Sequence, residues 1–174
     1  MIFNNHKNKV ADLDIVIGRT KINRVSSCKF LGVEIDEKLT WLPHIKQVEK
    51  KISSALFMIR HIRYKINRTT ALKLYDTLIL PYLNYCNILW GNAYKSHTSN
   101  IFRLQKRALK LCHTLKMQAS DNLFIITNKM SFYDIHKLQT AQLVFQYFHH
   151  EKLLPKCIHI VIVIIISLIY NIYL

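Results

Sequence analysis

The stretch TWLPHIKQVEKKISSALFMIRHI, residues 40–62, decides the expected fold because its apolar residues recur at helical spacing. They follow one another at steps of three or four residues: Ile45, Val48, Ile52, Ala55, Ile59 and Ile62. Such spacing places them on one side of an α-helix and leaves Lys and Arg side chains on the other sides. Thr40 is expected to cap this helix, and Pro43 is tolerated in its first turn.

Short β-strands are expected before this helix. Residues 13–17, apolar except for Asp14, are expected to form one strand that ends at Gly18, and Ile22 with Val25 indicates a second strand. Residues 29–35 are expected to form a third strand around Gly32. A glycine within a strand marks a bulge or a close approach of backbone. The polar residues that follow, 36–38, are expected to form a turn.

Further helices are expected after residue 62. Asn67 or Thr69 can cap a second helix that ends or kinks at Pro81. The apolar and aromatic residues 82–90 continue it, and Gly91 occupies the usual position after a helix end.

Two more amphipathic helices complete the predicted fold. One covers about residues 98–114, and the other opens at a capping box formed by Ser131 and Asp134 and runs to about His149. The residues expected to face inward in the first of these are Ile101, Leu104, Ala108 and Leu111. With only 3 Gly and 3 Pro, the chain does not suit an all-β architecture. The predicted fold is mainly α: short N-terminal β-hairpin strands, an amphipathic helical bundle and an apolar C-terminal segment.

Positive charge is concentrated in the middle of the chain. The net charge is +15, and residues 44–116 carry fourteen Lys or Arg against two acidic residues, which is +12. A phosphate backbone is the simplest partner for such a segment, and a solvated basic surface is the alternative. The predicted binding positions lie on basic helix faces: Lys46, Lys50, Arg60, Arg63, Arg103, Lys106, Arg107 and Lys110.

The sequence carries no recognisable catalytic or metal-binding constellation. The four cysteines are scattered and are expected to be reduced thiols: Cys28, Cys86, Cys112 and Cys157. Two pairs of alternate acids, Asp12 with Asp14 and Glu34 with Asp36, offer the oxygen ligands of Mg²⁺. We favour solvent-side positions on short hairpins for both pairs. No catalytic residue, metal, cofactor or small-molecule substrate is predicted.

The segment KFLGVEIDEKLTWLPHI, residues 29–45, resembles a pattern found in reverse transcriptases of non-LTR retrotransposons of the jockey-like group. Similar matches occur in residues 74–91, where Leu-Tyr, Pro-Tyr-Leu, Tyr-Cys and Trp-Gly recur, and in Leu-Gln-Lys-Arg-Ala at residues 104–108. Shorter matches follow at residues 135–139 and 154–155. The resemblance covers about residues 1–156.

This resemblance implies the end of a palm with the primer-grip β-hairpin at residues 1–39, a helical thumb-like domain at 40–117 and a helical C-terminal region at 118–156. Phe30, Leu31 and Gly32 would position the 3′ end of a primer, and the basic helix faces would hold the phosphates of an RNA template and its DNA primer. Residues that match the family's catalytic aspartates are absent from this sequence, so the resemblance implies that the chain is not a polymerase by itself. Trp41 and Trp90 are expected to be core anchors.

The last 18 residues, 157–174, contain no charged side chain and are rich in Ile and Val. They are just long enough for a transmembrane helix, which would make the chain a tail-anchored membrane protein with a basic cytosolic domain. We favour a translation of non-homologous sequence, because the family resemblance ends where this tail begins. The chain would then be cytoplasmic or nuclear. A host-adopted module that binds another protein is a third hypothesis.

Overall fold

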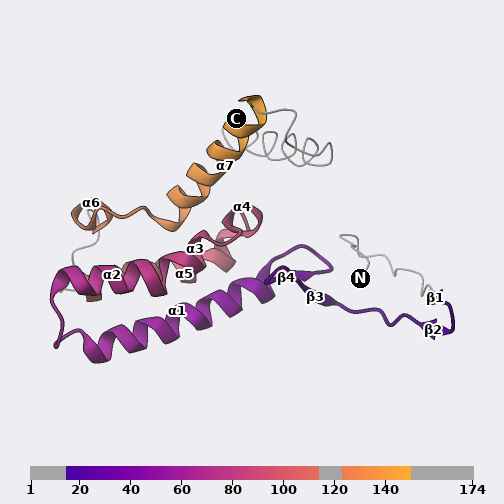
Figure 1. The fold of residues 1–174 in the computed structure, drawn as a ribbon, viewed down its shortest axis with the longest axis horizontal. Helices are drawn as coiled ribbons and strands as arrows, with labels where there is room; N and C mark the ends of the chain where they lie inside the picture. The colour runs from indigo at the N-terminus through magenta and orange to yellow at the C-terminus, as the bar shows by residue number, and fades with distance from the viewer. Residues whose placement is uncertain (1–14, 114–122, 150–174) are drawn as a thin grey trace.

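The computed structural model describes residues 15–113 and 123–149, and Figure 1 shows their arrangement. Two hairpins come first: β1 (Val16–Ile17) pairs with β2 (Thr20–Lys21), and β3 (Ser27–Phe30) pairs with β4 (Val33–Asp36), both antiparallel. The helices are α1 (Leu42–Ile62), α2 (Arg68–Leu78), α3 (Leu80–Asn84), α4 (Asn87–Trp90), α5 (Lys95–His113), α6 (Leu123–Thr127) and α7 (Phe132–His149). The predicted mainly helical fold with N-terminal hairpins is confirmed.

The β3–β4 hairpin corrects the prediction that Gly32 lies inside a strand. Phe30 pairs with Val33, so Leu31 and Gly32 form a two-residue turn. Both turn residues have positive φ, 45° and 83°, which is the backbone of a type I′ turn and matches the twist of the flanking strands. The chain therefore reverses at Gly32 instead of continuing through a bulge.

The start of α1 differs from the prediction that Thr40 caps it. The residue before the helix is Trp41, in a left-handed conformation with φ 61°. Its N–H donates to Asp36 Oδ1 at 2.8 Å, and the N–H of Thr40 donates to Asp36 Oδ2 at 3.0 Å. The Thr40 hydroxyl donates to Asp36 Oδ2 at 3.0 Å and accepts from the N–H of Leu42 at 3.3 Å. A carboxylate at the end of β4 has two oxygens, so it can hold this turn better than one hydroxyl.

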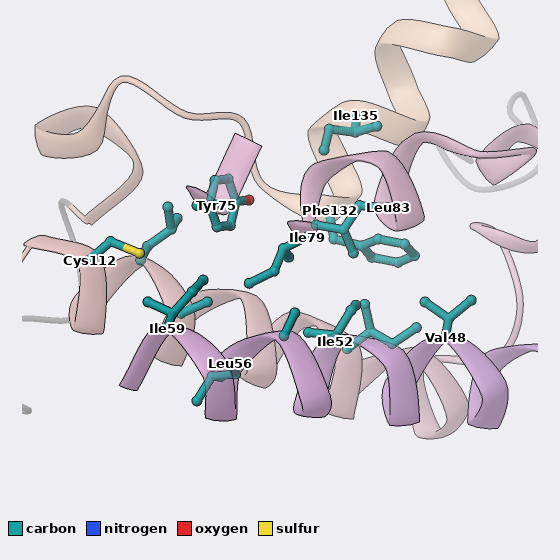
Figure 2. Packing of buried hydrophobic residues seen from close by; sticks show 14 of the residues in the cluster. Val48, Ile52, Leu56, Ile59, Tyr75, Ile79, Leu83, Cys112, Phe132 and Ile135 are labelled. Carbon is teal, nitrogen blue, oxygen red and sulfur yellow. The ribbon is translucent and has the colours of Figure 1, made fainter. Parts of the chain in front are cut away.

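The core lies between α1 and the helices above it, as Figure 2 shows with Val48, Ile52, Leu56 and Ile59 in a row. Of the six apolar positions predicted to face inward on α1, five are buried. Ile62 is 38% exposed, because it lies in the last turn of the helix. In Figure 2 Ile52 and Ile59 lie on the side of α1 that faces Tyr75 and Ile79, which are fully buried.

The segment after α1 follows the prediction in part. Asn67 caps α2, its Oδ1 accepting from the N–H of Thr70 at 2.8 Å. Residues 82–90 do not form one helix, because Cys86 has φ 49° and separates α3 from α4. Gly91 follows α4 but has φ −66°, so it does not adopt the left-handed conformation that usually favours glycine at a helix end. A Cβ at Gly91 would instead lie 2.6 Å from both the Asn87 carbonyl oxygen and the His136 Nδ1.

The start of α7 confirms Ser131 as its cap, but the Asp134 carboxylate bonds the Ser131 hydroxyl and not the Ser131 N–H of a full capping box. The N–H of Asp134 donates to Ser131 Oγ at 3.2 Å, and the Ser131 hydroxyl donates to the Asp134 carboxylate at 2.5 Å. Trp90 is fully buried, as predicted, and stacks on Phe132 with ring centroids 5.3 Å apart. Trp41 is half-buried against the same core. The sequence did not predict helix α6.

Several sequence predictions lie outside the described residues. They concern the acid pair at residues 12 and 14, Cys157, the match at residues 154–155 and the apolar segment 157–174. Within residues 15–113 and 123–149, no helix is long and apolar enough to cross a lipid bilayer.

Candidate nucleic-acid interface

The tip of the β3–β4 hairpin is exposed and apolar. Phe30 is 62% exposed and Leu31 is 75% exposed. The hydroxyl of Tyr85, from the turn between α3 and α4, donates a hydrogen bond to the Leu31 carbonyl oxygen. A Cβ at Gly32 would lie 3.4 Å from the Tyr85 ring. The tip is therefore held against the helices by one tyrosine, and both its positive φ and this contact favour glycine at position 32.

Strand β4 of the same hairpin is held by His44 in the first turn of α1. The N–H of Glu34 donates to His44 Nδ1 at 3.4 Å, and the His44 ring packs edge-on against Trp90 with centroids 5.4 Å apart. Burial lowers the pKa of His44, and Lys51 lowers it further. The neutral ring that results can accept a hydrogen bond at Nδ1.

The acid pair Glu34 and Asp36 is half-buried, which corrects the prediction that it faces solvent. Glu34 accepts from the Ser27 hydroxyl at 3.0 Å and from Gln47 Nε2 at 3.3 Å. Burial alone would raise the pKa of Asp36, but the hydrogen bonds from Thr40 and Trp41 outweigh it and lower that pKa. Both carboxylates are therefore occupied in fixing the hairpin and the start of α1.

On α1 the structure brings three of the four predicted cations to one face. Lys46, Lys50 and Arg60 are all exposed. At 100° per residue they span an arc of about 80° opposite the buried side of the helix. Arg63 does not join them: it is half-buried, with its Nε buried and its guanidinium 4.6 Å from the Tyr64 ring centroid. Arg63 is the residue just after α1, and the helical periodicity places it on the buried side, with Ile52 and Ile59.

On α5 all four predicted cations form one stripe, which we name the α5 basic stripe: Arg103, Lys106, Arg107 and Lys110. The two arginines are exposed and the two lysines are half-buried. Arg103 donates to Asn100 Oδ1 at 2.7 Å, and the Lys106 ammonium lies 4.6 Å from the Phe102 ring centroid. Helix α5 contains no acidic residue, so no side chain of the helix itself neutralises the stripe.

Sequence reasoning missed Gln105, which lies between the cations of the stripe but points into the protein. Its side chain is fully buried. Its Nε2 donates to the Tyr75 hydroxyl and to the Met130 carbonyl oxygen, both at 2.9 Å, and its Oε1 accepts from the N–H of Phe132 at 2.8 Å. Leu104, which was predicted to face inward, is only half-buried. One side chain thus fixes α5 to α2 and to the start of α7.

Sequence reasoning also missed the exposed rings of α1. Phe57 packs against His61 on the same face as Lys50, with ring centroids 4.2 Å apart. The sequence signal for this exposed ring is its position: Phe57 lies two helical turns after Lys50 and outside the set of apolar residues that face the core.

Among the described residues, no three His, Cys, Asp or Glu side chains gather to hold a metal ion. Cys28, Cys86 and Cys112 are free thiols. Burial raises the pKa of Cys112 to about 11, so this thiol is a packing group at neutral pH.

Comparison with known proteins gives three relatives, all from Drosophila melanogaster. The RNA-directed DNA polymerase from mobile element jockey is 30% identical over 86 residues, and the probable RNA-directed DNA polymerases from transposon BS and transposon X-element are 28% identical over 95 residues and 23% over 100. The chain is related to jockey-like reverse transcriptases. The matches cover 47–56% of this chain but only 9–11% of each relative, so the chain corresponds to a small part of a jockey-like reverse transcriptase. No protein-family model and no solved structure matches it.

Proposed function

We propose that this jockey-like fragment binds nucleic acid through its phosphate backbone and without reading sequence. The α5 basic stripe carries the proposal, because four cations share one helix face that has no acid. Cations at this spacing can follow a phosphate backbone, and phosphate contacts fix position without specifying bases. The α1 face with Lys46, Lys50 and Arg60 adds a second set of exposed cations.

The relatives are named as RNA-directed DNA polymerases, and this supports an RNA template paired with a DNA primer as the ligand. In this proposal residues 1–39 act as a primer-grip region, 40–117 as a thumb-like domain and 118–156 as a helical C-terminal region. The exposed tip with Phe30 and Leu31 contacts the primer end, and Tyr85 fixes the conformation of that tip. The chain supplies binding, while polymerisation needs acidic residues that the sequence does not match.

The test is fluorescence anisotropy with the full chain and a primed RNA template, titrated from about 50 to 200 mM salt. We expect binding that weakens steeply with salt. In Arg103→Glu/Arg107→Glu, the slope of log binding constant against log salt should fall by about 0.9 for each phosphate that the variant no longer neutralises. The matched control is Lys73→Glu/Lys137→Glu, which makes the same change in net charge at exposed positions on α2 and α7.

Equal weakening by both double variants would mean that only net charge matters, and the α5 basic stripe would lose its role. Wild-type affinity in the Arg103→Glu/Arg107→Glu variant would remove α5 from the interface. Unprimed RNA and duplex DNA, measured beside the primed template, test the finer proposal. A preference for the primed template is the expected result, and equal affinity for all three would restrict the function to general polyanion binding.

A further inference from the structure

The exposed face of α1 carries aromatic rings as well as cations. Phe57 is 63% exposed and packs against the His61 ring at a tilt of 52°. The His61 Nδ1–H donates to the Phe57 carbonyl oxygen at 3.0 Å, which fixes the orientation of the imidazole. Tyr64, in the turn that follows α1, is 84% exposed. Its ring lies 4.6 Å from the Arg63 guanidinium.

These rings are aligned with the cations of the same helix. Lys50 and Phe57 are seven residues apart, which places them about 10 Å apart along the helix axis and within about 20° of each other around it. Tyr64 follows seven residues later, in the turn just after the helix. Arg60 lies one turn beyond Phe57 on the same side. Glu49 is the one acid of α1, and it is half-buried. The face therefore presents rings between positive charges.

Packing within the fold does not account for Phe57. The buried residues of α1 lie on its opposite side, and the Phe57 ring contacts the imidazole of its own helix. Proteins that hold single-stranded nucleic acid combine cations along the backbone with rings on which successive bases stack. The positive charge beside these rings favours a polyanion over an apolar partner.

We propose that Phe57, His61 and Tyr64 form a stacking platform for unpaired bases of single-stranded RNA or DNA, with Lys50 and Arg60 holding the adjacent phosphates. This inference rests on the proposed nucleic-acid binding and adds a ligand class to it: a single-stranded segment next to the duplex. A duplex hides the faces of its internal bases, so the platform discriminates single strands from duplexes without reading sequence.

The experiment uses the full chain and three probes: an unstructured single strand of about 12 nucleotides, an abasic strand of the same length and a duplex. Phe57→Leu keeps an apolar residue but removes the ring. We expect its affinity for the single strand to fall about fivefold or more. Affinity for the abasic strand and the slope of log affinity against log salt should not change. Met58→Leu, about 100° around the helix at an exposed site, is the matched control and should bind as wild type.

Phe57→Trp restores a ring and reports directly on stacking. We expect affinity close to wild type, and quenching of the new indole by the single strand but not by the abasic strand. Wild-type affinity for the single strand in Phe57→Leu, or an equal loss on the abasic strand, would overturn the platform while leaving backbone binding in place. Absence of salt-dependent binding by the wild-type chain would overturn the proposed function and this inference together.

Discussion

Replacing Gln105 by Leu tests whether one buried amide fixes the helical bundle. The side chain is fully buried and makes hydrogen bonds to groups on two other parts of the chain. Leu is close to Gln in length and favours helix, so the substitution removes the polar contacts with little change in shape or helix propensity. The partners left behind are the Tyr75 hydroxyl, the Met130 carbonyl oxygen and the Phe132 N–H.

The expected loss of stability follows from these three partners. A typical hydrogen bond contributes about 1 kcal/mol net, and a buried partner left unsatisfied costs about 1–3 kcal/mol. Three bonds therefore predict a loss of about 3 kcal/mol or more in the free energy of unfolding. The surroundings of Tyr75 are dry enough that burial raises its pKa to about 12. Since domains of this size have about 5–15 kcal/mol of stability, the loss is a large fraction of the total.

Urea unfolding followed by tryptophan fluorescence is the appropriate assay, because Trp90 stacks on Phe132 next to one of the broken bonds. Gln142→Leu, at an exposed position of α7, is the matched control and should change the free energy by less than about 0.5 kcal/mol. Tyr75→Phe should cost less in the Gln105→Leu background than alone, because the two side chains share a bond. A Gln105→Leu protein as stable as the control, or additive effects of the two substitutions, would refute this account of the amide.

Three further predictions concern buried contacts and their pH dependence, each checked by urea unfolding. Gly91→Ala should lose about 2 kcal/mol or more, because the new Cβ collides with Asn87 and His136, whereas Gly18→Ala meets no atom within 4 Å and should lose only about 1–2 kcal/mol through its positive φ. Burial lowers the pKa of His136 from its ordinary 6.5, so on acidification the unfolded chain binds a proton at this histidine before the folded chain does. The free energy of unfolding should therefore fall as pH drops below about 6.5, and it should fall less steeply in His136→Gln. Hydrogen bonding lowers the pKa of Asp36, so its contribution is present above about pH 4 and is lost as pH falls through the lowered pKa; Asp36→Asn should flatten stability in that range.

The sequence predicted α1 well because each apolar residue of its stripe has one role, to face the core. Ile45, Val48, Ile52, Ala55 and Ile59 are all buried, and the helix ends at Ile62, the last position of the pattern. The exposed faces of α1 and α5 follow from the same periodicity. Once the apolar side is fixed, most of the predicted cations fall on the remaining sides of the two helices, and Arg63 is the one that does not.

The sequence failed where a polar residue takes a core position. Ile101, Ala108 and Cys112 follow a spacing of seven and four residues, and Gln105 completes it at four and three. The spacing alone therefore places Gln105 on the buried side of α5, but because Gln is polar, the prediction placed Leu104 there instead. The three partners that make a buried amide stable come from residues 75, 130 and 132, which no local pattern connects to position 105.

Helix starts and turns failed for a related reason. Thr40 has the ordinary chemistry of a cap, but the helix begins one residue later, because Asp36 at the end of β4 accepts from the N–H groups of Thr40 and Trp41. From sequence alone, Gly32 is predicted to interrupt a strand; only the pairing of Phe30 with Val33 shows that it belongs to a turn. In both cases the deciding contact comes from how a neighbouring element is placed, and residue type alone does not contain that information.

Several residues that carry the family resemblance pack against one another inside the structure, whereas Phe30 and Leu31 of the same match are exposed. His44 packs edge-on against Trp90, Gly91 makes room for the ring of His136, and Gln105 ties α5 to the start of α7. Their shared task is to hold the hairpin and helices in one arrangement, and each depends on specific neighbours. Phosphate binding does not depend on specific neighbouring residues, since any exposed Lys or Arg at helical spacing can contact a phosphate. The matched residues His44, Trp90, Gly91, Gln105 and His136 thus explain the packing that orients the basic faces, and the function of those faces has to be tested through their charge and their rings.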